Sequence, residues 1–192
     1  MEKYLRIGML LLGIFLVGAA ISAVTKNRIA YYHSVELATQ RTIVAKNKEL
    51  SSLRDRERQL DCLAKNVYFE AGSESFEGKV AVAQVTMNRV NHPNFPKDVC
   101  QVVYQKTVVM QRVICQFSWY CQNGGRPRIK HPELYAESYE VAKKVLLENF
   151  RLSTMKDAMY FHGTYINPNW GKERIGVIGN HVFYRERKDA NI

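Results

Sequence analysis

The sequence predicts an α+β fold, mainly helical with a small antiparallel sheet, preceded by a transmembrane helix and a helical stalk. Three observations support this prediction. Residues 7–24 are uncharged and apolar, residues 25–60 contain no Pro or Gly, and the pattern changes from a helical to a strand period near residue 158. We therefore expect a membrane anchor or signal segment at 1–24, a polar stalk at 25–60 and a globular domain at 61–192.

The first segment reads IGMLLLGIFLVGAAISAV, and its 18 residues are at the lower limit for spanning a bilayer. Basic residues flank it on both sides, so the positive-inside rule gives no orientation. Small residues at 18–20 also suit a signal peptidase, so a cleaved signal peptide stays open, as does a buried core helix. We expect a retained single-pass anchor in the inner membrane, with the domain outside the cytoplasm, in the periplasm or cell wall. Secretion after signal cleavage is the alternative.

The stalk has a sparse apolar pattern. Ile43, Leu50, Leu53 and Leu60 follow an a/d-like spacing that Glu57 interrupts. Either this segment is a solvated helix or it forms a weak homodimeric coiled coil through residues 25–60.

The domain begins with helical patterns. A helix around 63–71 is expected to end at Gly72, and Ser75 is expected to cap a second helix carrying Val80, Ala83, Met87 and Val90. The stretch VAVAQV also fits strand alternation, so a strand stays open there. A loop at 91–96 and a short helix at 98–106 follow.

The second half of the domain changes period. After a loop at 124–127, Pro132 opens a helix with an inner stripe, and strands are expected at 158–162 and 177–184, the latter bent at Gly179-Asn180. The stripe consists of Leu134, Ser138, Val141, Ala142, Val145 and Leu146.

Four cysteines, Cys62, Cys100, Cys115 and Cys121, lie within the expected domain. An even number suits disulfides in an exported domain, and four cysteines allow three pairings. We predict that Cys115 pairs with Cys121, closing a short loop, and that Cys62 pairs with Cys100. Four buried thiols are the alternative.

The net charge of +10 suits an anionic partner, such as nucleic acid, lipid headgroups or the bacterial cell wall. No nucleic-acid-binding signature accompanies the charge, so no nucleic acid is expected. The sequence has no CxxC or HExxH spacing and no phosphate-binding glycine motif, so neither a metal nor a cofactor is expected.

Glu70 lies where an apolar helical stripe is expected to continue. Leu63, Val67 and Glu70 are spaced i, i+4 and i+7, so they share one helix face. A carboxyl group on a core-facing stripe is either paired or keeps its proton near neutral pH, because burial disfavours the charged form. A protonated carboxylic acid at a cleft wall is suited to breaking a glycosidic bond, so we predict Glu70 to be catalytic.

Five blocks along the domain, in order, resemble the SleB/CwlJ cell wall hydrolase family. They cover about residues 61–185 and read YFEAGSESFEGKVAVAQVTMNRV, FPKDVCQVVYQ, CQFSWYC, AMYFHGTYINPNW and IGNHVFY. The resemblance implies a lysozyme-like fold and cleavage of peptidoglycan between N-acetylmuramic acid (MurNAc) and N-acetylglucosamine (GlcNAc). Peptidoglycan is therefore the expected partner, besides the membrane.

The catalytic glutamate of the family is the first Glu of its E-A-x-x-E block, which corresponds to Glu70. The usual E-A-R-G-E reads EAGSE here, so Gly72 replaces the arginine and any role of that arginine is lost. Glu74 also matches, and we predict it to be a supporting acid; exposure or capping of the next helix is its alternative.

The reaction depends on the number of carboxylates. A hydrolase needs a second carboxylate, whereas a lytic transglycosylase uses one glutamate as acid and then as base towards the C6 hydroxyl of MurNAc. The resemblance favours the lytic transglycosylase. A hydrolytic muramidase, or a catalytically inactive wall-binding or assembly protein, is the alternative.

Sugar-binding sites combine aromatic faces with hydrogen-bonding groups. On this basis and from the family blocks, we predict substrate contacts for Gln116, Trp119, Tyr160 and His181. Structural roles stay open for Tyr160 and His181 on the expected strands, and core packing is expected for Phe117.

Overall fold

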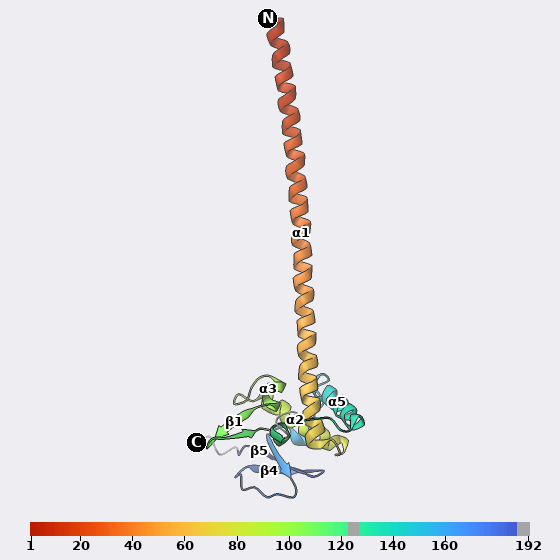
Figure 1. Cartoon of the computed structure of the whole chain (residues 1–192), viewed down its shortest axis with the longest axis vertical. Helices are drawn as coiled ribbons and strands as arrows, with labels where there is room; N and C mark the ends of the chain where they lie inside the picture. Colours follow the sequence, from red (N-terminus) through yellow and green to blue (C-terminus); the bar gives the residue numbers. More distant parts are fainter. Residues whose placement is uncertain (123–126, 188–192) are drawn as a thin grey trace. The chain divides into compact units, whose positions relative to one another are not determined.

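The computed structural model describes residues 1–122 and 127–187, and the loop expected at 124–127 lies mostly outside them. Contacts divide the chain into two compact units, Met1–Leu53 and Arg54–Ile192. Helix α1 runs without a break from Glu2 to Ala71 (Figure 1). The first unit is the helix up to Leu53, and its side chains are all exposed.

The first unit contains a stretch that is long and apolar enough to cross a membrane. It lies near the N-terminus, and no part of it is buried inside the protein. A signal sequence has the same length and composition. The apolar segment at residues 7–24 is thus a candidate membrane span, in agreement with the sequence prediction.

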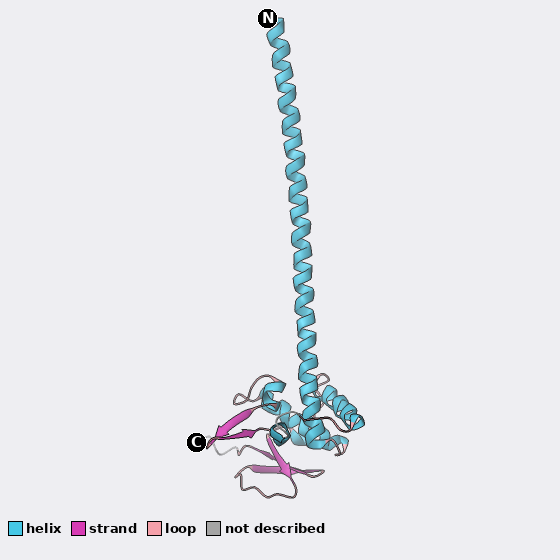
Figure 2. Cartoon of the chain, in the orientation of Figure 1, coloured by secondary structure: helices cyan, strands magenta, loops and turns pink. Residues whose placement is uncertain are grey.

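The second unit is mainly helical, with short strands in two separate sheets (Figure 2). In chain order after α1, its elements are α2 Phe76–Asn91, α3 Val99–Val103, β1 Lys106–Val109, β2 Arg112–Cys115, α4 Ser118–Cys121, α5 Pro132–Leu146, η2 Ser153–Met155, β3 Tyr160–Gly163, β4 Glu173–Ile178 and β5 His181–Arg185. The predicted α+β class is confirmed.

Helix α2 is the central helix of this unit. Ser75 caps it as predicted, because its Oγ accepts the Gly78 N–H at 3.3 Å. Every residue from Gly78 to Met87 is buried. A helix enclosed on all sides has no polar face that reveals its period, which explains why VAVAQV fits a strand equally well.

Of the two helices beside α2, α1 ends and α5 begins at the residue that the sequence predicts. Helix α1 ends at Ala71, just before Gly72, and α5 begins at Pro132. Four members of the predicted inner stripe of α5, Ser138, Val141, Ala142 and Val145, are buried, whereas Leu134 and Leu146 at its two ends are half-buried.

The core lies on two sides of α2. One cluster joins α2 to α1, α3, α4 and α5 and includes Leu63, Val80 and Val145, all fully buried. The second cluster joins α2 to the strands through Val82 and Phe183. Complete burial of each such side chain contributes about 1.5–3 kcal/mol. The two clusters fix both the end of α1 and the sheet against the same helix.

The larger sheet has the strand order β3-β5-β4, and both pairings are antiparallel. The expectation of one bent strand at 177–184 is wrong. Strands β4 and β5 are separated by the two-residue turn Gly179-Asn180, where Gly179 has φ +56°. This positive φ suits glycine, so the chain reverses at the position where a bend was expected.

The β1–β2 hairpin was not predicted. Its register pairs Val108 with Val113, and both side chains are exposed. The chain turns at Met110 and Gln111, which both adopt positive φ although neither is glycine. Without a Gly or Asn turn signal, and without a buried face, the pattern of a hairpin is missing. Because β1 begins at Lys106, α3 is also shorter than the helix expected at 98–106.

Both predicted disulfides are present. Cys62 in α1 is bonded to Cys100 in α3, and Cys115 at the end of β2 is bonded to Cys121 at the end of α4. The first joins residues 38 apart in sequence, so it constrains the unfolded chain more than the second, whose separation is 6.

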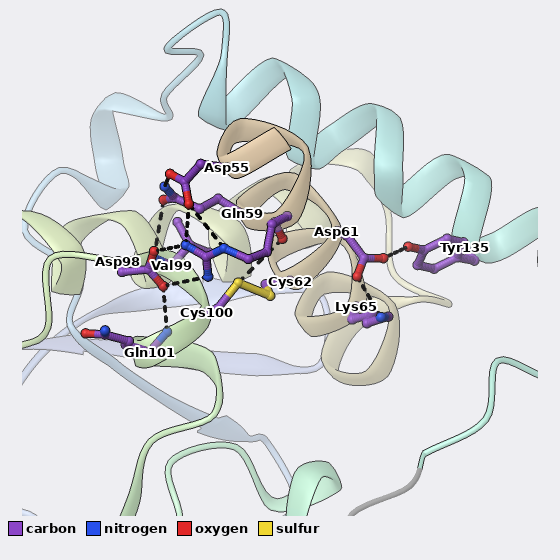
Figure 3. Close-up of a disulfide and its surroundings, with 11 residues drawn as sticks. Asp55, Gln59, Asp61, Cys62, Lys65, Asp98, Val99, Cys100, Gln101 and Tyr135 are labelled. Atoms are coloured by element: carbon purple, nitrogen blue, oxygen red, sulfur yellow. Dashed lines mark hydrogen bonds and ion pairs between the residues drawn. A yellow bond between two sulfur atoms is a disulfide. The ribbon is translucent and has the colours of Figure 1, made fainter. Parts of the chain in front are cut away.

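Polar contacts surround the first disulfide (Figure 3). Arg58 in α1 forms ion pairs with Asp55 one turn earlier and with Asp98, the N-cap of α3. Further along the helix, Asp61 accepts a hydrogen bond from the hydroxyl of Tyr135 in α5 at 2.7 Å. These contacts and the disulfide fix the last turns of α1 to α3 and α5, which determines where the helix presents its C-terminal side chains.

Candidate active site

Two hollows meet at the end of α1. Four residues, Phe69, Glu70, Trp119 and Gln122, line both, so the hollows form one cleft that passes across Glu70. The basic hollow has a volume of about 850 Å³ and is also lined by Tyr68, Gly72, Ser73, Pro127, Arg128, Lys130, His131 and Leu134. The aromatic hollow has a volume of about 630 Å³ and is also lined by Glu74, Arg89, Cys115, Gln116, Phe117, Ser118, Tyr160, Phe161, His162, Gly163, Tyr165, Ile166, Trp170, Asn180 and His181.

Glu70 lies at the centre of this cleft. Leu63 and Val67, on the same helix face, are fully buried, whereas Glu70 is half-buried at the cleft wall. Burial raises the pKa of Glu70 from 4.5 to about 7, against an opposing effect of the Arg89 charge. Near neutral pH a large fraction of Glu70 therefore carries its proton, which is the state of a general acid.

Arg89 is a buried cation behind the aromatic hollow. It is 3% exposed, its Nε donates to the Met159 carbonyl at 2.9 Å, and its Nη1 has no hydrogen-bond partner among the described residues. The guanidinium lies 5.2 Å from the ring centroid of Phe117 and 5.9 Å from that of Tyr160. Burial lowers the pKa of Arg89 to about 10. It thus remains charged at neutral pH and limits the rise in the pKa of Glu70.

Glu74 contacts the turn between β4 and β5. The Asn180 N–H lies 3.3 Å from both carboxylate oxygens, and the Asn180 side-chain amide donates to Oε1 at 2.9 Å. A Cβ at Gly179 would lie 1.8 Å from Oε2, so any other residue there would displace the Glu74 carboxylate. Glu74 lies between α1 and α2, and it is neither exposed nor the cap of α2, whose N-cap is Ser75. It accepts hydrogen bonds from the distant hairpin while lining the aromatic hollow.

His181 and His162 lie on neighbouring strands in the aromatic hollow. His181 is buried, and its Nδ1 lies 3.9 Å from Glu74 Oε1 without a hydrogen bond. Burial lowers the pKa of His181, and Glu74 opposes this effect. His162 is fixed by the Tyr184 hydroxyl, 2.9 Å from Nε2, and its ring stacks on that of Tyr184.

The segment between Cys115 and Cys121 forms the wall shared by the two hollows. Gln116 is exposed and reaches the aromatic hollow, whereas Phe117 is 3% exposed and belongs to the core, as expected. Trp119 lines both hollows with its ring, but it is 6% exposed and its indole N–H donates to Asn66 Oδ1 at 3.0 Å. Its ring stacks on Phe69 with centroids 4.6 Å apart. Trp119 is therefore a fixed wall of the cleft.

The structure brings all six predicted site residues to this cleft: Glu70, Glu74, Gln116, Trp119, Tyr160 and His181. Apart from Glu70 and Trp119, the residues that line the basic hollow were not predicted from the sequence. There the Tyr68 hydroxyl accepts the backbone N–H groups of Lys130 and His131 at 3.0 and 3.1 Å. No local pattern indicates that these residues, 62 and 63 positions away from Tyr68, lie beside the acid. Within residues 1–122 and 127–187, no group of His, Cys, Asp and Glu is arranged to hold a metal ion.

Comparisons with known proteins show what the chain is similar to. The chain is 29% identical over 129 residues to the spore cortex-lytic enzyme of Bacillus subtilis, which covers 63% of this chain and 35% of that protein. It is 25% identical over 134 residues to the spore cortex-lytic enzyme of Halalkalibacterium halodurans, which covers 66% of this chain and 34% of that protein. The chain thus spans about a third of the length of these relatives.

The fold is similar to the crystal structure of the catalytic domain of the Bacillus cereus SleB protein. The TM-score is 0.50 at 22% identity, and the match covers 67% of this chain and 91% of that domain. A family model described as Cell Wall Hydrolase matches residues 73–184. The match begins just after Glu70 and includes Glu74 and the residues of β3 and β5 that line the aromatic hollow. Because this match covers more than half of the sequence, the chain belongs to the cell wall hydrolase family.

Proposed function

We propose that this protein cleaves the glycan strands of peptidoglycan at the MurNAc–GlcNAc bond, with Glu70 as general acid. The observation that carries the proposal is a half-buried carboxylic acid with a pKa of about 7 at the centre of a continuous cleft. Such an acid donates its proton to the glycosidic oxygen as the bond breaks and positive charge develops on the sugar ring. The family membership and the spore cortex-lytic relatives support peptidoglycan as the substrate.

The reaction is proposed to be a lytic transglycosylation with a single catalytic glutamate. Glu70 and Glu74 are the only carboxylates among the described residues that line the cleft. Glu74 already accepts hydrogen bonds from Asn180, so its oxygens are poorly placed to activate a water molecule. After protonating the leaving oxygen, the Glu70 carboxylate takes the proton of the MurNAc C6 hydroxyl, and O6 bonds to C1. The product is a 1,6-anhydro end.

The aromatic hollow is proposed to hold the sugar rings. Gln116 supplies an exposed amide, and Tyr160 and Trp170 supply ring faces from β3 and the loop that follows it. His181 contributes one edge of the same hollow, and Trp119 forms the floor beside Glu70.

The domain is proposed to work outside the cytoplasm, tethered by the apolar segment. Two disulfides favour an oxidising compartment, because thiols stay reduced in the cytosol. The positive net charge favours adhesion to the anionic wall.

Digestion of purified peptidoglycan with the full chain, followed by mass spectrometry, tests the proposal. Transglycosylation yields muropeptides that are lighter by one water than hydrolysis products and that resist borohydride reduction. Glu70→Gln should release nothing while keeping its fold by circular dichroism. Products with reducing ends would instead support a muramidase. An inactive wild type that still binds sacculi would support a wall-binding protein.

The muramidase is the second candidate because Glu74 lines the same hollow as Gln116 and His181. A water-activating role for Glu74 requires that Glu74→Gln abolish cleavage. A role confined to fixing the hairpin requires that this variant, which keeps the oxygen that accepts from Asn180, retain most of the activity.

A further inference from the structure

The two hollows on either side of Glu70 differ in charge. Arg128 and Lys130 are exposed in the basic hollow, and neither is ion-paired with another residue in the described part of the chain. Among the residues that the structure describes, Glu70 is the only carboxylate that lines this hollow, and it keeps its proton up to about pH 7. Glu133, the nearest acid in sequence, lies outside the lining and is 3.4 Å from His131. Within residues 1–122 and 127–187, no carboxylate forms an ion pair with Arg128 or Lys130, so the basic hollow presents positive charge to a ligand.

The backbone that carries these cations is fixed to the helix of the acid. Tyr68, on the last turns of α1 beside Glu70, accepts the N–H groups of Lys130 and His131. Its ring packs edge-on against Phe69 and Tyr135, with centroids 4.8 and 6.0 Å away. The positive charge is thus held on one defined side of the proposed reaction centre.

The aromatic hollow offers no comparable charge to a ligand. Arg89 lies there beneath the rings of Phe117 and Tyr160, and its Nη1 is inaccessible to solvent. Tyr165 and Trp170 are instead exposed on this side, with ring faces that suit neutral sugars. One half of the cleft is therefore built for uncharged rings and the other half for an anion.

We propose that the basic hollow binds carboxylates carried on the lactyl branch of MurNAc. This inference rests on the proposed function and names the feature of the glycan that the cleft selects. GlcNAc has no such branch, so the charge places MurNAc, and with it the direction of the strand, relative to Glu70. The carboxylate belongs either to the lactyl group itself or to a peptide attached to it, and both sources present the same chemistry to Arg128 and Lys130.

Binding of the full chain to peptidoglycan sacculi in detergent, measured by sedimentation, tests this inference. The Glu70→Gln background prevents cleavage. Three probes are compared: sacculi with their peptides, sacculi stripped of peptides so that lactyl carboxylates remain, and peptide-bearing sacculi whose carboxylates are converted to neutral amides. Arg128→Gln/Lys130→Gln is compared with Lys143→Gln/Lys144→Gln, which removes the same charge from α5 residues that line neither hollow.

The basic-pair variant is expected to bind carboxylate-bearing sacculi about tenfold more weakly, since each charge-assisted contact at an exposed site is worth a few-fold. The same variant should lose nothing on the amidated sacculi, and the control should match the parent on all three probes. An effect on peptide-bearing but not on stripped sacculi assigns the charge to the peptide. An effect on stripped sacculi alone assigns it to the lactyl group, whose carboxyl is consumed in an amide bond wherever a peptide is attached. Equal effects on both mean that the basic hollow accepts a carboxylate from either source.

Equal losses for the two double variants, or an equal loss on amidated sacculi, would overturn the inference. Cleavage by the wild type is measured separately. If the wild type releases no products while the charge-dependent binding holds, the proposed function fails and the inference stands. If the wild type cleaves and the basic pair has no effect on binding, the inference alone fails.

Discussion

The raised pKa of Glu70 has a measurable consequence for stability. Its pKa is 4.5 in an unfolded chain and about 7 in the folded one. Between these values the folded protein binds a proton that the unfolded chain has released, so the free energy of unfolding falls as pH rises. At about 1.4 kcal/mol per pH unit, the fall between pH 4.5 and pH 7 amounts to about 3 kcal/mol. Below pH 4.5 and above pH 7 this group contributes no further change.

Glu70→Gln removes this titration while keeping a similar shape. The variant is therefore expected to gain stability relative to the wild type as pH rises, by about 3 kcal/mol between pH 4 and pH 8. Urea unfolding of the full chain in detergent, followed by tryptophan fluorescence at several pH values, measures the difference. Because both proteins share every other titrating group, only the Glu70 contribution remains. A difference between the two proteins that is constant across this range would refute the reasoning.

The same pKa governs the proposed activity. Glu70 must carry its proton to act as an acid, so kcat/KM on peptidoglycan should fall about tenfold per pH unit above pH 7. An activity that continues to rise from pH 7 to pH 9 would mean that another group, or an ionised Glu70, performs the first step.

Three further changes test the structure. Gly179→Ala places a Cβ against the Glu74 carboxylate, whereas Gly171→Ala, at a similar φ of +60°, meets nothing within 4 Å. In urea unfolding, Gly179→Ala should therefore lower the free energy of unfolding by about 2 kcal/mol more than Gly171→Ala does. Equal losses for the two variants would mean that backbone strain alone matters. Asn66→Ala leaves the buried Trp119 N–H unpaired and should cost about 3 kcal/mol in urea unfolding, and a cost below 1 kcal/mol would indicate that this hydrogen bond is dispensable. Deletion of the apolar segment should move the protein from the membrane fraction to the soluble fraction after cell disruption, and a deletion variant that stays with the membrane would disprove the anchor.

Local sequence signals predicted one end of each of the helices α1, α2 and α5, and the central acid. Ser75, Pro132 and Gly72 mark helix ends through backbone chemistry that acts within a few residues. The position of Glu70 followed from its spacing to Leu63 and Val67, because a helix converts such a spacing directly into a shared face. These predictions required no knowledge of distant contacts.

Distant contacts account for what the sequence did not predict. Lys130 reaches the cleft because the Tyr68 hydroxyl binds its N–H, and Glu74 meets Asn180, 106 residues away. Trp119 lines the cleft, as the family block indicated, but its indole N–H donates to the buried side chain of Asn66 on another helix, and no local pattern indicates that pairing. A one-dimensional pattern does not encode such pairings, since any of several polar residues could satisfy the same donor.

The Glu74–Asn180 contact also bears on how the protein matures. Residues 160–181 supply the far wall of the aromatic hollow, whereas Glu70 belongs to a helix completed at residue 71. In the proposed export, residue 70 crosses the membrane before residues 160–181, so the acid is exposed long before that wall exists. We expect the nascent protein to remain harmless to the cell wall until translocation is nearly over, and a chain truncated after residue 172 to release no muropeptides.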